Sequence, residues 1–116
     1  MDVTTESFER DVIERSSERP VVVDFWAAWC APCRALGPAI ESEVAKRSDK
    51  LELVKVDVDS ESAIAARYGI QSIPTVAVFR DGEAVNGFIG AYPAGTIGKF
   101  FDELLAEDEA AAQQVV

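Results

Sequence analysis

One stretch decides how this chain is expected to fold, namely Val21-Val22-Val23-Asp24-Phe25-Trp26-Ala27-Ala28-Trp29-Cys30-Ala31-Pro32-Cys33. It begins with an almost continuous apolar run, which is typical of a central strand covered on both faces. It ends with the only two cysteines of the chain, separated by two residues. At the start of a helix such a pair lies on one face about one turn apart, close enough for a disulfide. The first question is whether this pair does redox chemistry.

Two other uses of the cysteine pair are disfavoured by the rest of the chain. With 116 residues the chain is one ordinary domain, large enough to bury roughly two-thirds of its unfolded surface without a crosslink. A disulfide across so short a loop also removes little entropy from the unfolded chain. A zinc site needs three or four protein ligands, but the sequence has no histidine and no further cysteine. We therefore expect no metal, unless a site forms between molecules.

The charge balance limits the classes of partner. The chain has 21 acidic and 11 basic residues, a net charge of −10, which argues against nucleic acid or anionic lipid as partners. No stretch approaches the roughly 18 to 20 apolar residues of a membrane span, and residues 1–6 lack the basic and apolar parts of a signal peptide. We expect a cytoplasmic protein, and in that compartment a close cysteine pair is more often a redox or metal centre than a scaffold.

The elements around the cysteine pair can be read from periodicity. A helix is expected from Thr4, which caps it, to about residues 16–18. A second helix continues from the cysteines to about Arg47, with a kink at Pro38. Residues 51–58 are expected to form a second buried strand. Strand, helix and strand in this order imply a parallel crossover.

The second half of the chain predicts a hairpin between two helices. Asp59 or Ser60 is expected to cap a short helix that Gly69 ends. The Asp81-Gly82 turn should join antiparallel strands at residues 75–80 and 83–89. A last helix presents Ile97, Phe100, Phe101, Leu104 and Leu105 to the sheet. We expect one α/β domain over residues 1–106, a mixed sheet flanked by helices, and a disordered acidic tail over residues 107–116.

The stretch from Asp24 to Cys33 resembles the active-site segment of the thioredoxin family. Further family features follow in the same order and approximate spacing over roughly residues 3–105: Pro38, Lys55, Tyr68-Gly69-Ile70, Ile73-Pro74-Thr75, Asp81-Gly82 and Gly90-Ala91. The resemblance implies the thioredoxin fold. The chain departs from the family at Ala31, where glycine is usual, and in its first strand, which is shortened to the surroundings of Val3.

The two cysteines are expected to have different roles. The attacking sulfur must be a thiolate, whereas a free cysteine has a pKa of about 8.5. If Cys30 lies at the helix start, unpaired backbone N–H groups and the helix dipole stabilise its anion. Cys30 is therefore the expected nucleophile, and Cys33, one turn inside the helix and less exposed, the resolving thiol. A structural disulfide or inert thiols are the alternatives.

Two charged residues interrupt the apolar strands. Aspartate rarely lies unpaired in a run such as that around Asp24, and burial would raise the pKa of its carboxyl group. The resemblance gives Asp24 a general acid/base role toward Cys33, whereas a strand-edge carboxylate facing water is the alternative. Lys55 in the next strand is expected to interact electrostatically with Asp24; otherwise it is a surface lysine whose aliphatic stem covers apolar residues.

Pro74 opens a predicted strand, a position that suits proline for structural reasons alone. The resemblance implies instead a cis Ile73–Pro74 bond facing the disulfide, with the Ile73 backbone free to pair with an extended substrate segment. The residues expected to bind substrate around Cys30 are Trp29, Ala31, Pro32, Ile73, Pro74, Gly90 and Ala91.

The resemblance implies an enzyme that reduces disulfides in other proteins. We expect a monomer, because nothing beyond the small apolar surface around the cysteines demands a partner subunit. Cys30 and Cys33 would end as a disulfide, which a separate thioredoxin reductase, a flavoprotein or a ferredoxin-linked enzyme, reduces again. No cofactor is expected in this chain, since electrons would arrive through thiols. Two alternatives remain: a thioredoxin-like oxidase or isomerase, and a non-catalytic binding or holdase subunit that uses the apolar surface around the cysteines.

Overall fold

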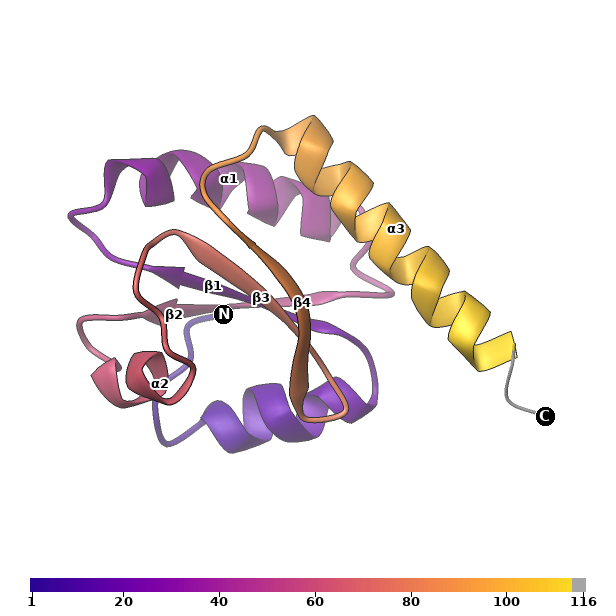
Figure 1. Cartoon of the computed structure of the whole chain (residues 1–116), viewed down its shortest axis with the longest axis horizontal. Helices are drawn as coiled ribbons and strands as arrows, with labels where there is room; N and C mark the ends of the chain where they lie inside the picture. Colours follow the sequence, from indigo (N-terminus) through magenta and orange to yellow (C-terminus); the bar gives the residue numbers. More distant parts are fainter. Residues whose placement is uncertain (114–116) are drawn as a thin grey trace.

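The computed structural model describes residues 1–113 as a four-stranded sheet with helices on both faces (Figure 1). The sheet has the strand order β2-β1-β3-β4, in which β2 is parallel to β1 and the other neighbours are antiparallel. This confirms the predicted crossover and hairpin. The strands are β1 Val21–Trp26, β2 Glu52–Asp57, β3 Thr75–Arg80 and β4 Glu83–Ile89; the helices are η1 Glu9–Glu14, η2 Arg15–Ser17, α1 Ala31–Ala45, α2 Ser62–Arg67 and α3 Ala94–Gln113.

The central strand β1 serves two apolar cores, one on each face of the sheet. Helices α1 and α3 cover one face, and α2 with the N-terminal helical segment covers the other (Figure 1). Successive side chains of a strand point to opposite faces, so Val21 and Val23 join Phe8 and Phe79 on one side, whereas Val22 packs with the α1 and α3 residues. Asp24 alternates onto the α1 face.

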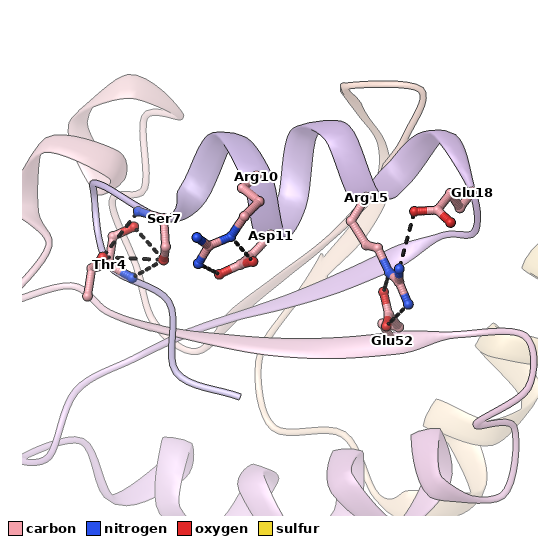
Figure 2. A network of polar contacts seen from close by, with 7 residues as sticks. All are labelled: Thr4, Ser7, Arg10, Asp11, Arg15, Glu18 and Glu52. Atoms are coloured by element: carbon pink, nitrogen blue, oxygen red, sulfur yellow. Dashed lines mark hydrogen bonds and ion pairs between the residues drawn. The ribbon is translucent and has the colours of Figure 1, made fainter.

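The N-terminal segment ends at Ser17, as predicted, but it is a π-helix followed by a 3₁₀ turn rather than a regular α-helix. At its start Thr4 and Ser7 exchange hydrogen bonds: the Ser7 N–H donates to the Thr4 hydroxyl at 3.2 Å, and the Thr4 N–H donates to the Ser7 hydroxyl at 3.0 Å (Figure 2). Arg15 then binds Glu52 of β2, with Nη2 2.8 Å from Oε1 (Figure 2). This ion pair fixes the helical segment against the edge of the sheet.

Two local predictions meet different outcomes in the middle of the chain. Helix α1 is one helix with Pro38 inside it, as expected. The predicted cap of the next helix is wrong, because α2 begins after Glu61. The reason is that Asp57 Oδ1 accepts the N–H groups of Asp59 and Ser60 at 2.9 and 3.4 Å. These residues form a turn before the helix instead of capping it.

The predictions for the two ends of the chain also meet different outcomes. The first strand is reduced to one bridge between Asp2 and Lys55, as the shortened N-terminus predicted. The disordered tail expected from residue 107 is wrong as far as Gln113, because α3 continues to that residue. Arg80 holds this turn of the helix through Asp108, with Nε 2.8 Å from Oδ1, and alanines at 110–112 favour helix. The remainder of the expected tail, residues 114–116, lies outside the described residues.

The last helix presents its apolar side to the sheet as predicted. Ile97, Phe101 and Leu104 are buried, and Phe100 and Leu105 pack against the same core. Among the described helices, none combines the length and the apolar character that crossing a membrane requires.

Candidate active site

Cys30 occupies the junction between the central strand and helix α1. It is the N-cap of the helix, and the backbone N–H of Cys33 donates to Cys30 Sγ at 3.2 Å. Pro32 sits in the first turn, where its missing N–H costs no helical hydrogen bond. The N–H groups at a helix start and the helix dipole both favour negative charge. Cys30 Sγ is therefore placed where a thiolate is stabilised.

The cysteines form a disulfide with a Cα–Cα distance of 5.2 Å. The exposed fractions of Cys30 and Cys33 are 4% and 3%. Exposure therefore does not separate the two residues, contrary to the expectation that Cys33 is less exposed. The Cys33 N–H bond to Cys30 does distinguish them, because only the sulfur at the N-cap accepts a backbone hydrogen bond of this kind.

Asp24 lies behind the disulfide on the α1 side of the sheet. It is 1% exposed, so a carboxylate facing water at a strand edge is the wrong interpretation. Neither carboxyl oxygen has a hydrogen-bond partner among residues 1–113. A recess of about 240 Å³ beneath α1 brings its carboxyl group together with the following residues: Trp26, Cys33, Arg34, Gly37, Pro38, Glu41 and Lys55.

Burial raises the pKa of Asp24 to about 6. The positive charge of Lys55 opposes this rise, and the negative charge of Glu41 adds to it. The physical cause is that a buried carboxylate loses its hydration without gaining a hydrogen-bond donor. The group can therefore change protonation near neutral pH, which suits it to proton transfer.

Lys55 is the parallel register partner of Asp24 across β1 and β2, as the neighbouring strands predicted. Its ammonium group nevertheless binds another carboxylate: Nζ lies 3.0 Å from Glu41 Oε1 and 5.4 Å from the centroid of the Trp26 ring. Sequence reasoning missed Glu41. Its signal was present, because Cys33, Gly37 and Glu41 follow one another at intervals of four along α1 and so share a helical face.

The chain around Pro74 reaches the disulfide from the other side. The Ile73–Pro74 peptide bond is cis, and Ile73 packs against the buried cluster of Ala27, Cys30 and Cys33. Within the part of the chain that the structure describes, the Ile73 backbone makes no hydrogen bond. The N–H of Gly90 donates to Pro74 O at 2.9 Å, which brings Gly90 and its neighbour Ala91 beside Pro74.

The predicted substrate surface is only partly exposed. Trp29 is 68% exposed, and Ala31, Pro32 and Ala91 are also exposed. Ile73 and Gly90 are half-buried. Pro74 is buried, and its carbonyl oxygen accepts the Gly90 N–H. Pro74 therefore supports the surface from below.

Two polar contacts at this surface were not predicted. The Trp29 indole N–H donates to Asp59 Oδ2 at 2.8 Å, and Arg34 Nη1 donates to Ala28 O at 2.7 Å. Both orient the segment that carries the cysteines. Sequence periodicity contains no signal for the first contact, since its partners lie 30 residues apart.

Comparison with known proteins decides the family. The sequence model described as Thioredoxin matches residues 1–103. This chain belongs to the thioredoxin family. It is 42% identical to Thioredoxin 1 of Synechococcus elongatus over 103 residues, which are 89% of this chain and 94% of that protein. It is 44% identical to a Streptomyces clavuligerus thioredoxin over 82% of this chain and 86% of that protein. Identity to the chloroplastic M-type thioredoxin of Chlamydomonas reinhardtii is 41%, over 89% of this chain and 72% of that protein.

Membership in the thioredoxin family identifies the function of the disulfide. The chain has the thioredoxin fold and is a thiol–disulfide oxidoreductase that acts on protein disulfides through the redox-active pair Cys30 and Cys33. A thioredoxin reductase returns such an enzyme to its dithiol form. The structural disulfide and the purely non-catalytic role are thereby set aside.

Proposed function

We propose that this thioredoxin-family enzyme works as a reductase of protein disulfides, with Cys30 as nucleophile and Cys33 as resolving thiol. One observation carries the assignment: Cys30 is the N-cap of α1, and the Cys33 N–H points at its sulfur. A thiolate at that position is stabilised before the substrate arrives. Cys33, which follows one turn later, lies within bonding distance of Cys30 and so can release the substrate.

The proposed reaction has two exchange steps. In the first, the Cys30 thiolate attacks one sulfur of the substrate disulfide; a mixed disulfide forms, and the other substrate sulfur leaves with the electron pair and takes a proton. In the second, Cys33 loses its proton and attacks Cys30 Sγ; the Cys30–Cys33 bond forms, and the first substrate sulfur leaves and is protonated. The substrate has then gained two electrons and two protons; the enzyme has lost two electrons, the Cys33 proton and the proton that Cys30 released when it ionised before the first step.

Asp24 is the proposed acid/base group of the second step. It shares a recess with Cys33, and its raised pKa of about 6 lets it accept the thiol proton near neutral pH and release it again. Lys55, which also lines this recess, moderates the charge that the deprotonated carboxyl group carries. The recess is large enough for a water molecule to relay the proton.

The proposed substrate is an extended protein segment beside its disulfide. The unpaired backbone of Ile73 offers a donor and an acceptor for strand addition. The exposed apolar residues Trp29, Ala31, Pro32 and Ala91 surround the disulfide with a contact surface, and Gly90 and Pro74 shape it from below. The acidic character of the chain, with net charge −10, favours substrates whose surface is less acidic.

The proposed setting is a monomer in the cytoplasm that a flavoprotein or ferredoxin-linked thioredoxin reductase keeps reduced. Support comes from the chemistry, since a disulfide reductase must work where its dithiol is regenerated faster than it is oxidised. Measuring the oxidation state of Cys30 in growing cells by thiol alkylation tests this setting. A pair that is mostly oxidised contradicts it.

The decisive experiment is the equilibrium reduction potential of the Cys30/Cys33 pair in a thiol–disulfide buffer. A reductase should give a reduction potential of about −270 mV, the value typical of thioredoxin. A value near −120 mV, typical of strong oxidants, would instead favour the oxidase alternative. As a companion test, Cys33→Ser should accumulate the mixed disulfide, whereas Cys30→Ser should form none.

A further inference from the structure

The charged groups beneath α1 are paired in an unexpected way. The recess behind the disulfide holds the carboxyl groups of Asp24 and Glu41 and the cations of Arg34 and Lys55. Arg34 is directed to Ala28 O, 2.7 Å away. Lys55 is the register partner of Asp24, yet its Nζ binds Glu41 Oε1 at 3.0 Å. The buried carboxylate is left without a partner, and the exposed one has the cation.

This pairing is the reverse of what burial energetics favours. A buried carboxylate without a hydrogen bond is costly, so an ammonium group within reach should stabilise it. The Glu41 side chain is 53% exposed and water already solvates it. The Lys55 ammonium is nevertheless held by Glu41 and by the face of the Trp26 ring, 5.4 Å from its centroid. Both contacts hold the cation where it makes no hydrogen bond to Asp24.

We propose that Glu41 is a positioning residue of the exchange reaction: by binding the Lys55 ammonium group, it keeps that cation off Asp24 and leaves the Asp24 carboxyl group free to accept and return the Cys33 proton. This inference rests on the proposed acid/base role of Asp24. Among the described residues, Glu41 hydrogen-bonds Lys55 and neither sulfur, so its positioning action passes through Lys55.

Among residues 1–113, the surroundings of Asp24 provide no other carboxylate that could hold the Lys55 ammonium group away from it. From α1, Cys33, Arg34 and Glu41 face the recess, and Lys55 faces it from β2. On β3 the register neighbour of Asp24 is the apolar Val76. A β-carbon on Gly37 would lie 3.7 Å from Lys55 Nζ, an ordinary contact distance, so the ammonium group lies against this face of α1. Within the described part of the chain, Glu41 is thus the carboxylate that competes with Asp24 for the ammonium group.

Removing the charge of Glu41 should act on Asp24 in two ways with the same sign. The direct repulsion by Glu41, which raises the pKa of Asp24, disappears. The released lysine can then pair with Asp24, which lowers that pKa further and holds the carboxyl group in its charged form. An ordinary surface ion pair would affect stability slightly and leave the Asp24 titration unchanged.

The test is a ¹³C NMR titration of the Asp24 carboxyl carbon in the reduced full-length protein. For Glu41→Gln the midpoint should fall by about half a pH unit or more, and Glu41→Asp should restore most of the shift. Glu103→Gln is the matched control, because this residue on α3 is exposed and lies outside the recess; its midpoint should equal that of the parent protein. The pH profile of mixed-disulfide release should move with the NMR midpoint.

A second variant protein, which lacks the Lys55 charge, separates the positioning of Lys55 by Glu41 from the direct repulsion between Glu41 and Asp24. In Lys55→Met protein the further change Glu41→Gln should shift the Asp24 midpoint by less than half as much as in the parent protein. An equal shift in both backgrounds overturns the proposal, as does an unchanged midpoint in the Glu41→Gln single variant. Failure of the proposed function has a different signature, since Asp24→Asn would then release the mixed disulfide at the parental rate whatever the NMR titration shows.

Discussion

Helix α1 borders two buried carboxyl groups whose pKa values are shifted in opposite directions. Asp24, below its first half, is 1% exposed, and Glu43, near its end, is 6% exposed. Asp24 has no hydrogen-bond partner among the described residues, and its pKa rises to about 6. Glu43 binds Lys46 at 2.8 Å and Arg47 at 3.2 Å, and these cations lower its pKa. Burial alone therefore does not set the direction of the pKa shift. The presence or absence of a bound cation sets it.

The two carboxyl groups serve different purposes: the paired group stabilises the fold, and the unpaired group can exchange a proton. Arg47 also binds Asp102 at 2.9 Å and the carbonyl oxygen of Gly98 at 3.2 Å, so the Glu43 cluster joins α1 to α3. A group that is paired in this way has no freedom to exchange a proton near neutral pH. An unpaired carboxyl group beside a thiol keeps that freedom, at a cost in stability.

The largest effect should follow from replacing the unpaired carboxyl group. Asp24→Asn removes the proton acceptor of the resolving step, so release of the mixed disulfide should slow about 100-fold, the lower range for general acid/base catalysis. Formation of the mixed disulfide should change far less. Stopped-flow measurement of both steps with a fluorescent disulfide substrate checks this. Equal slowing of the two steps would mean that the substitution disturbs the nucleophile instead.

The same substitution should stabilise the fold at neutral pH. The folded pKa of Asp24 is about 6, whereas an aspartate in the unfolded chain has its ordinary pKa of 3.8, so its contribution to stability is full below about pH 4 and is lost as the pH rises through 6. Asp24→Asn should therefore raise the free energy of unfolding by about 3 kcal/mol at pH 7.5 and change it little at pH 3.5. Urea unfolding at the two pH values tests this; an equal gain at both would assign the effect to packing.

The paired carboxyl group of Glu43 can be displaced by a larger side chain on the neighbouring helix α3. A β-carbon on Gly98 would lie 2.5 Å from Glu43 Oε1 and 3.3 Å from Arg47 Nη2. Gly98→Ala should therefore leave the protein about 1–2 kcal/mol less stable than Gly95→Ala does, because both gain helix propensity but only the first displaces the Glu43 side chain; the exchange rates should not change. Gly95→Ala is the matched control on the same helix, because no atom lies within 4 Å of its added β-carbon. Destabilisation by both variants would locate the effect in the helix backbone rather than in the cluster.

The smallest effect should come from removing only the charge of Glu43. Glu43→Gln should lower the urea midpoint at pH 7, since Lys46 and Arg47 lose their anionic partner. The folded pKa of Glu43 lies below the ordinary glutamate value of 4.5, so the stabilisation is present above that pH and is lost as the pH falls further. The parent and the variant should converge in acid. A difference that widens in acid would contradict this assignment.

Two wrong predictions share one physical cause. The helix cap was assigned to Asp59 or Ser60 because such residues cap helices locally, but Asp57 already binds their N–H groups. The tail was expected to be disordered because it lacks an apolar stripe, yet Arg80 of β3 holds Asp108. In both places a specific polar partner overrode a local pattern, and polar partners leave little trace in periodicity.

The sequence by itself determined the order of the elements, the two-sided burial of β1 and the place of the cysteine pair at a helix start. These follow from apolar periodicity and from turn and cap residues, which act within a few positions along the chain. Tertiary structure alone decided that Lys55 binds Glu41 rather than Asp24, that Asp59 holds Trp29, and that Glu43 is buried with its cations. Such choices depend on which side chains from distant segments come within hydrogen-bond distance, a quantity that only the packing of the helices on the sheet fixes.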